Sequence, residues 1–451
     1  MIKLGCPEIG KQQLYKVKNT AQKFRNSIII MLVFMLCSGL KAQMPEKVLV
    51  GYWENWSDLR IKDLDPRYNV IMLAFLEADT DYPARPDNNV VGDLEFTANA
   101  SQVKADIAIV QAKGKKVLIS IGGANGSFKL NNVSEKNTFV TKVKDFISAY
   151  EVDGIDIDIE RTVYSCMTTG SLTNAENHHQ LLIDGVKELL VWYQSTFGKK
   201  MLLTTAPETL YVQGGLSKWA ECGGSFLAFI EQLRDDLDLV MVQLYNSGAM
   251  FDLDLVSREQ GTQTFLVAMT EAVIRGFQTQ TFGYFSGIDA SKVAVALPAC
   301  GGGGYVAPDE LVSAVKYLMG TGPKVGNYTL KNTAGYGNLA GLMTWSINSD
   351  ESSACGRYSF ADASERILGP IGVAAMPTTN SFTIFPNPTS SVIEIEGLGF
   401  DFTLLKVCDY TGKVLLEKQV SSRNSQVDVS GLSSGIYAVL VGNKLVKMVK
   451  Q

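Results

Sequence analysis

Histidine is almost absent from this chain, which has 451 residues but only two histidines. The two are neighbours, His178 and His179, and adjacent positions on a helix do not converge on one ion. The composition therefore argues against a metal centre built on histidines. We expect neither a metal nor an organic cofactor.

An excess of basic residues is also lacking, because the formal net charge is -5. Residues 1–42 hold seven of the 41 Lys and Arg and one of the 46 Asp and Glu, which leaves 34 basic and 45 acidic residues elsewhere. Binding to phosphates needs a basic face, so the sequence predicts no nucleic-acid partner. Its 46% hydrophobic and 19% charged residues are typical of folded domains, and its length favours two or three of them.

The apolar run near the amino end is too short for a membrane span, which needs roughly 20 residues. This run, residues 28–36, follows a stretch with five basic side chains and precedes small residues that end at Ala42. The arrangement is typical of a secretory signal peptide. We expect residues 1–42 to be removed and predict no permanent membrane span; a membrane anchor is the alternative.

Eight apolar segments that suit buried parallel strands alternate with stretches of helical periodicity. They begin at residues 47, 69, 116, 153, 200, 238, 292 and 339, and helical stretches include residues 139–150 and 179–193. Eight strands with crossovers are what a (β/α)8 TIM barrel requires. We therefore predict an α/β barrel over residues 43–369, with a doubly wound open sheet as the alternative. Functional side chains are expected at the carboxyl ends of the strands in either case.

The sequence changes character after the predicted barrel. Residues 370–380 have the composition of a linker, and residues 381–451 read as short alternating strands separated by turn signals. This pattern predicts a small β-sandwich domain.

The fourth apolar segment carries three acids at alternate positions, Asp156, Asp158 and Glu160. In a strand all three project from one face, while the intervening isoleucines project from the other. Burial and mutual repulsion both disfavour ionisation, so at least one acid should hold a proton near neutral pH. A proton donor is what cleavage of a glycosidic bond needs. A solvent-facing acidic strand or a calcium site made of oxygen ligands is the alternative.

With Asp153 and Gly154 this segment reads DxxDxDxE, and SIGG lies on the third strand at residues 120–123. GYWENW begins at Gly51, MVQLYN at Met241 and MTWSIN at Met343. Together these motifs resemble the family 18 glycoside hydrolases, the chitinases and their relatives. The resemblance covers the whole predicted barrel.

The resemblance implies a role for each acid. Glu160 matches the general acid and base, and Asp158 matches the residue that orients the substrate's 2-acetamido group. Asp156 would share a proton with Asp158, Asp153 would support the strand end, and Tyr245 would donate a hydrogen bond to the acetamido oxygen. In this family the acetamido oxygen itself attacks the anomeric carbon, so cleavage through an oxazolinium ion with retention is expected.

Further positions match the family's substrate pocket. Trp345 matches the tryptophan beneath the scissile sugar, and sugar faces stack on such rings. The other pocket positions are Tyr52, Phe75, Gln243, Met241, Asn246, Gly122 and Gly123, with Ser120 as structural support. Trp53, Trp56 and Trp219 could be sugar platforms, but aromatic residues near strands are more often core.

The sequence departs from the family pattern in two places. Arg161, Thr162 and Val163 follow Glu160, where many chitinases have an aromatic residue and a proline, so the leaving-group side and the substrate are open. The stretch of residues 298–339 is short, which predicts a shallow cleft and favours internal cleavage or a broad range of oligosaccharides. Residues 301–304 are four glycines and read as a mobile loop, a poor phosphate cradle because no Lys-Ser or Lys-Thr follows.

Five cysteines remain after the leader, and disulfides persist in exported proteins. In a barrel, Cys166 and Cys222 lie on neighbouring loops, as do Cys300 and Cys355. We predict these two disulfides, which require Cα separations below about 7 Å. Cys408 would be left over.

The tail resembles the C-terminal sorting domain of type IX secretion substrates, through FPNP at Phe385, DYTGK at Asp409, SSGIY at Ser433 and the terminal lysines. It implies the type IX machinery as a partner and secretion through the periplasm to the outer surface or beyond. The predicted function is a secreted chitinase that cleaves β-1,4-linked N-acetylglucosamine. The alternatives are an endo-β-N-acetylglucosaminidase acting on the chitobiose core of N-glycans and a non-catalytic glycan-binding protein.

Overall fold

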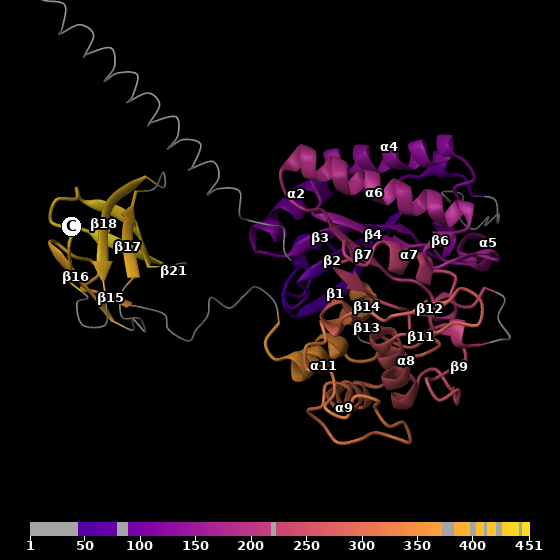
Figure 1. Cartoon of the computed structure of the whole chain (residues 1–451). Coiled ribbons are helices and arrows are strands. Elements are labelled where there is room, and N and C mark those ends of the chain that lie inside the picture. Colours follow the sequence, from indigo (N-terminus) through magenta and orange to yellow (C-terminus); the bar gives the residue numbers. More distant parts are fainter. Residues whose placement is uncertain are drawn as a thin grey trace, which may run out of the picture. The chain divides into compact units, whose positions relative to one another are not determined.

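The structure is a computed structural model that describes residues 44–78, 89–217, 222–352, 354–371, 383–396, 403–409, 413–420, 426–441 and 444–451. Contacts between residues divide the chain after residue 373 into two compact units (Figure 1). The predicted signal peptide, most of the predicted linker and Trp219 lie outside the described residues.

The first unit is built on an eight-stranded parallel sheet. In spatial order its strands are β13 (Ala294–Pro298), β14 (Gly341–Trp345), β1 (Val48–Glu54), β2 (Val70–Leu76), β3 (Lys116–Gly122), β4 (Gly154–Asp158), β7 (Leu202–Thr205) and β8 (Leu239–Val240). Parallel bridges from Val240 to Val293 and from Gln243 to Ala296 join the two outer strands. The sheet therefore closes on itself, and the predicted barrel is confirmed.

The longer helices cover the outside of the barrel (Figure 1), and short helices of four or five residues follow β3, β4 and β14. They are α2 (Ala100–Ala112), α3 (Gly123–Gly126), α4 (Val133–Tyr150), α5 (Thr162–Ser165), α6 (Asn177–Phe197), α7 (Leu227–Gln232), α8 (Gln263–Arg275), α9 (Pro308–Leu318), α10 (Ile347–Glu351) and α11 (Ser359–Leu368). The side chains of Asn99 and Asn132 accept hydrogen bonds from backbone N–H groups in the first turns of α2 and α4. Such N-caps explain where these helices begin.

Several short elements lie in the loops of the first unit. They are the 3-10 turns η1 (Ile61–Asp63), η2 (Val91–Asp93), η3 (Thr209–Tyr211), η4 (Gln213–Leu216) and η5 (Ala290–Lys292), and the two-residue strands β5 (Gly170–Ser171), β6 (Asn174–Ala175), β9 (Met250–Phe251), β10 (Ser257–Arg258), β11 (Phe277–Gln278) and β12 (Tyr284–Phe285).

Alternation along each barrel strand separates two hydrophobic cores. On β1, Val48, Val50 and Tyr52 belong to the core inside the barrel, while Leu49 and Trp53 belong to the core between strands and helices. The isoleucines of the fourth segment lie in the outer core and are at most 3% exposed. The strand therefore turns its acids inward, as the two-residue period predicted.

The second unit has two antiparallel sheets that share one core. The first contains β15 (Thr383–Phe385), β16 (Val392–Glu396) and β19 (Gln426–Asp428); the second contains β18 (Val414–Val420), β17 (Thr403–Cys408), β20 (Gly435–Val441) and β21 (Lys444–Lys450). Ile393 and Val427 from the first sheet cluster with Val407 and Val439 from the second. This arrangement is a small β-sandwich.

Both predicted disulfides are present in the first unit. Cys166 bonds to Cys222 with Cα atoms 4.9 Å apart, and Cys300 bonds to Cys355 with Cα atoms 5.5 Å apart. Cys408 is free and buried. Within the described part of the chain, no helix has the length and apolar character to cross a membrane.

Candidate active site

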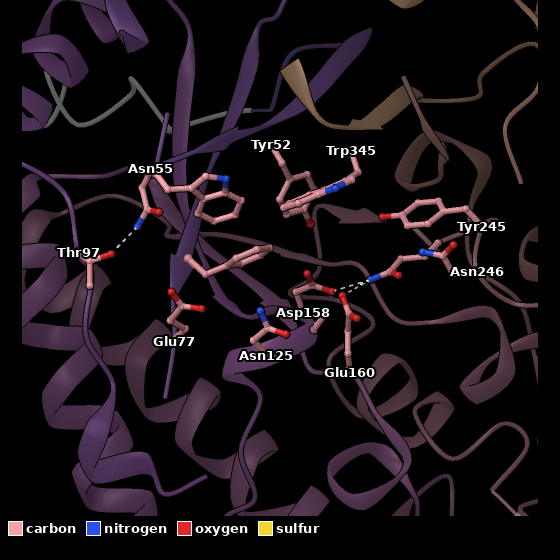
Figure 2. A pocket seen from close by; sticks show the side chains of 14 residues that line it. Tyr52, Asn55, Glu77, Thr97, Asn125, Asp158, Glu160, Tyr245, Asn246 and Trp345 are labelled. Carbon is pink, nitrogen blue, oxygen red and sulfur yellow. Dashed lines mark hydrogen bonds between the residues drawn. The ribbon is translucent and has the colours of Figure 1, made fainter. Parts of the chain in front are cut away.

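The carboxyl ends of the barrel strands surround a cavity of about 700 Å³. Asn55, Thr97 and Glu77 lie toward one end, Tyr245 and Asn246 toward the other, and Asp158 and Glu160 between them (Figure 2). The remaining lining residues are Tyr52, Trp56, Phe75, Ala124, Asn125, Gln243 and Trp345. No lysine, arginine or histidine is among these described lining residues, so the only ionised side chains the lining can present near neutral pH are carboxylates.

Asp156 lies fully buried beneath the cavity floor and accepts three hydroxyl hydrogen bonds. Its Oδ2 accepts from the Tyr52 hydroxyl and from Ser120 Oγ, each at 2.7 Å, and its Oδ1 accepts from Thr204 Oγ1 at 2.6 Å. Burial raises the pKa of Asp156, and the three donors act in the opposite direction. No hydrogen bond joins Asp156 to Asp158 in this described region, so the proton sharing that the resemblance implied stays a prediction.

Gln243 links the other two acids. Its Nε2 donates to Asp158 Oδ1 at 2.8 Å and to Glu160 Oε1 at 3.0 Å, and also to the carbonyl of Ala206 at 3.0 Å (Figure 2). Burial, followed by the negative charges of Glu160 and Asp156, raises the pKa of Asp158 well above its usual range.

Burial also raises the pKa of Glu160, to about 7; the hydrogen bond from Gln243 acts in the opposite direction, and the charge of Glu208 adds a smaller increase. The two carboxyls held by Gln243 therefore favour retention of a proton near neutral pH. Such a group, placed at a cavity wall, can act as a general acid.

Backbone contacts hold the end of β4 against β3. The N–H of Glu160 donates to Ser127 Oγ at 2.8 Å, and that hydroxyl donates to the carbonyl of Gly123 at 2.8 Å. Gly122 has a φ of 114°, and a Cβ there would lie 2.3 Å from the carbonyl oxygen of Asp158. Gly122 is thus needed for close approach of the two strands, whereas a Cβ at Gly123 would lie 2.9 Å from the Phe75 ring; neither glycine is among the described cavity-lining residues.

Aromatic rings form one wall of the cavity. Phe75 and Trp345 stack with centroids 5.5 Å apart and an interplanar angle of 15°, and Tyr52 is 5.7 Å from Trp345. Trp56 extends this wall at 6.2 Å from Trp345 and is 59% exposed. Trp53 is instead buried in the outer core and donates from its indole nitrogen to Leu59, so of these two less certain tryptophans only Trp56 reaches the cavity.

Tyr245 and Asn246 form the opposite wall and rest on the glycine run. The N–H of Asn246 donates to the carbonyl of Gly303 at 2.8 Å, and a Cβ at Gly304 would lie 2.6 Å from Tyr245 Cα. The sequence interpretation treated these glycines only as a loop. Their contact with Tyr245 forms only when the folded barrel brings the two loops together, so the spacing of residues along the chain could not predict it.

Three predicted residues support the site from outside the cavity. Asp153, at the amino end of β4, accepts from the N–H of Val117 at 3.1 Å and from Gln111 Nε2 at 3.0 Å. Ser120 binds Asp156, and Met241 is fully buried in the inner core. The remaining predicted pocket residues, Tyr52, Phe75, Gln243, Asn246 and Trp345, all line the cavity.

Sequence reasoning missed several residues of the site. Asn55 lies within GYWENW and Glu77 follows β2, so position at a strand end was an available signal for both. Ala124 and Asn125 lie in α3 directly after β3, where the same signal was available, whereas Thr97 comes from a loop without it. Ser127, Thr204 and Glu208 act on the acids through hydrogen bonds or charge and carry no motif of their own.

Comparison with protein families gives two matches. The family model "Glycosyl hydrolases family 18" matches residues 48–316, and the model "Secretion system C-terminal sorting domain" matches residues 383–451. The second match confirms the prediction that the protein is secreted.

Individual relatives match the barrel region. "Chitinase D" of Niallia circulans is 39% identical over 323 residues, which are 67% of this chain and 59% of that protein. "Chitinase ChiA" of Flavobacterium johnsoniae is 37% identical over 339 residues, 70% of this chain and 21% of that protein. The chain thus spans about three fifths of the first relative's length and about a fifth of the second's.

Among solved structures, a family GH18 chitinase from Chromobacterium violaceum superposes with a TM-score of 0.61 at 29% sequence identity. The match covers 74% of this chain and 86% of that one.

Proposed function

Because the chain belongs to the glycosyl hydrolases of family 18, we propose that it is a secreted chitinase that cleaves β-1,4-linked N-acetylglucosamine polymers internally and with retention. The observation that carries the proposal is the pair Asp158 and Glu160, joined through Gln243 Nε2 at the wall of an aromatic-lined cavity. The names of the relatives in Niallia and Flavobacterium favour chitin as the substrate.

In the proposed reaction Glu160 donates its proton to the bridging oxygen as the glycosidic bond breaks. The substrate's acetamido oxygen attacks the anomeric carbon, and the bond it forms gives an oxazolinium ion. Asp158 carries negative charge toward the acetamido nitrogen, and Tyr245 donates to the acetamido oxygen. Water, deprotonated by Glu160, then opens the ring and restores the acetamido group with the original anomeric configuration.

Substrate-assisted attack is favoured because Gln243 ties Asp158 and Glu160 to the same nitrogen. Asp156 is the third acid, but it lies beneath the floor with both oxygens occupied by hydroxyl donors. Neither acid is therefore placed as a separate nucleophile opposite Glu160.

The test is hydrolysis of chitin oligosaccharides, during which proton NMR monitors the anomeric form of the newly formed reducing end. We expect the β-anomer first, products shorter than the substrate from internal cuts, and loss of about 10³-fold or more of the rate in Glu160→Gln. An α-anomer as first product, or equal cleavage of a fully deacetylated polymer, would contradict the mechanism.

The same assay separates the alternatives. Release of glycan from a high-mannose glycoprotein, with intact chitin oligosaccharides, would identify the endo-β-N-acetylglucosaminidase instead. Tight binding of oligosaccharides without turnover would identify a binding protein. The presence of Asp156, Asp158, Glu160 and Tyr245 in one site favours turnover.

For the C-terminal unit we propose recognition by the type IX secretion machinery, with release to the outer surface or the medium. This rests on the sorting-domain match at residues 383–451.

A further inference from the structure

The segment that follows β7 holds Gln243 from several sides. The backbone N–H of Gln243 donates to the carbonyl of Pro207 at 2.9 Å, and its Nε2 donates to the carbonyl of Ala206 at 3.0 Å. Thr209 Oγ1 donates to the carbonyl of Gln243, and the backbone of Glu208 pairs with Gln243 in a parallel bridge. Residues 206–209 therefore fix the amide that binds both Asp158 and Glu160.

The side chain of Glu208 also supports the backbone that directly follows Glu160. Its Oε2 accepts from the backbone N–H of Arg161 at 2.8 Å. Arg161 directly follows Glu160 and has a φ of 71°, which is unfavourable for a residue with a Cβ. Glu208 is not among the residues that line the cavity, so it reaches the reaction only through its neighbours.

We propose that Glu208 is a positioning residue of the hydrolytic site, which fixes Glu160 through the backbone of Arg161 and places a negative charge behind it. The inference rests on the proposed function, because it concerns the proton that Glu160 delivers. No conformational change is needed, since all the contacts exist in the structure as it stands.

The charge of Glu208 acts on a defined set of groups. Glu160, Asp158, Tyr245 and Tyr211 are the titratable groups whose pKa the Glu208 charge raises, and the side chain of Arg161 is the charged group on the adjoining turn. Burial raises the pKa of Glu208 itself, and the Arg161 N–H lowers it. Loss of the Glu208 charge makes ionisation of Glu160 easier. The proton of Glu160 is then lost at a lower pH.

Two substitutions separate the effect of the side-chain length of Glu208 from the effect of its negative charge. Glu208→Gln keeps an oxygen that can accept from Arg161 but removes the charge, whereas Glu208→Asp keeps the charge but shortens the reach. The matched control is Asp238→Asn, because Asp238 accepts from the N–H of Leu203 near the other end of β7. Each full-length variant is assayed for kcat and KM against pH on a chitin oligosaccharide with an aryl leaving group.

For Glu208→Gln we expect the alkaline limb of kcat/KM to move to lower pH, with kcat at pH 5 within about threefold of the parent. For Glu208→Asp we expect the limb to stay in place and kcat to fall by about tenfold or more, since a misplacement of about 1 Å can cost roughly 10²-fold. KM should change little in either variant. The control Asp238→Asn should have the same kcat as the parent and the same alkaline limb in its pH profile of kcat/KM.

An alkaline limb of Glu208→Gln that coincides with those of the parent and the control overturns the role of the charge. An unchanged kcat in Glu208→Asp overturns the role in positioning. Thermal unfolding of each variant shows whether a loss of activity comes only from unfolding. If Glu208→Asp is unfolded, the pH profile of the folded Glu208→Gln variant tests the proposal. An inactive parent defeats the proposed function, and this inference with it, whereas an active parent with an unmoved limb defeats the inference on charge alone.

Discussion

Gln243 Nε2 carries two protons, yet three acceptors lie within 3.0 Å of it: Asp158, Glu160 and the carbonyl of Ala206. The three acceptors therefore compete for two protons, and at least one of them lacks a full hydrogen bond from this nitrogen. Asp158 is buried and Glu160 is partly buried, so these two adjacent carboxylates cannot both ionise cheaply. The acid proton retained near neutral pH therefore belongs to the pair Asp158 and Glu160 as much as to Glu160 alone. A substitution of either acid should change the pKa of the other.

A stability measurement can detect this proton without substrate. The pKa of Glu160 is raised from 4.5 to about 7 by burial. The folded protein then binds more protons than the unfolded chain between these values, so stability is full below about pH 4.5 and is lost as pH rises through 7. Glu160→Gln removes this loss. The difference in melting temperature, Glu160→Gln minus parent, should therefore be larger at pH 8 than at pH 5 by about 2 °C or more.

Glu188→Gln is the control for the Glu160→Gln experiment. Lys136 and Lys144 lower the pKa of Glu188 at the surface, so its charge stabilises the fold above its pKa. We expect little effect from this exposed site and no gain between pH 5 and pH 8. A Glu160→Gln difference that is the same at both pH values would show that Glu160 is ionised normally.

The acids of the site could be predicted from sequence because alternation with isoleucine fixes their face. Their partners could not. The resemblance implied Tyr52 and Ser120 as site residues, but not their contact with Asp156, and Thr204 carried no signal; the three lie on three other strands and meet Asp156 only once the barrel is formed. Glu208 is a similar case, since nothing near it in sequence marks it as a neighbour of Glu160.

At the scale of elements, the junction of β3 with β4 depends on glycine. In Gly122→Ala the new Cβ would lie 2.3 Å from the carbonyl oxygen of Asp158. The end of β4 must shift, so we expect loss of about 2 kcal/mol of stability or more and a rate lower by roughly 10²-fold. Urea unfolding and hydrolysis of chitin oligosaccharides measure the two effects.

Gly114→Ala is a matched control for Gly122→Ala, because Gly114 has a similar positive φ of 83° but no atom within 4 Å of its Cβ position. It should cost only the backbone strain, about 1 kcal/mol, with unchanged turnover. Equal activity of the two variants would show that close approach at Gly122 is not required.

The two disulfides enclose nearly equal lengths of chain, 56 and 55 residues. The chain-entropy account then predicts nearly equal contributions, about 4 kcal/mol each. Replacing either pair with serine should lower the free energy of unfolding of the barrel by a similar amount in urea. Cys408→Ser, at a free cysteine in the other unit, should leave barrel unfolding unchanged. A large difference between the pairs would mean that native contacts, rather than loop length, decide the effect.

The barrel strands could be predicted because each is a run of apolar residues of sufficient length. The sixth strand is shorter than its apolar segment: the segment begins at residue 238 and continues through the motif MVQLYN, whereas β8 ends at Val240. Beyond that point the chain pairs only at isolated bridges such as Gln243 with Ala296, because it diverges to bring Gln243 and Tyr245 to the cavity. Two-residue strands such as β5 and β6 have too few residues for any periodic signal.

At the scale of the whole molecule, each described unit has a hydrophobic core of its own. All members of the barrel cores lie before residue 372, and the sandwich core begins at Ile384. Neither unit needs side chains of the other to bury its apolar surface, which is the usual condition for independent folding. The division of labour in the sequence, acids and aromatic rings in one unit and a sorting domain in the other, can therefore be tested by cutting between them.

Deleting residues 381–451 while keeping the leader should leave the barrel folded and active but unable to cross the outer membrane. The expected result is activity per mole within about twofold of the parent and the same melting temperature, because the barrel cores are intact. Cell fractionation should find the truncated enzyme in the periplasm and the parent outside. Fusing residues 370–451 to an unrelated periplasmic protein is the reciprocal control and should carry that protein out. Normal export of the truncated chain would contradict the role of the sandwich, whereas loss of activity with correct retention would mean that the barrel depends on contacts beyond its own cores.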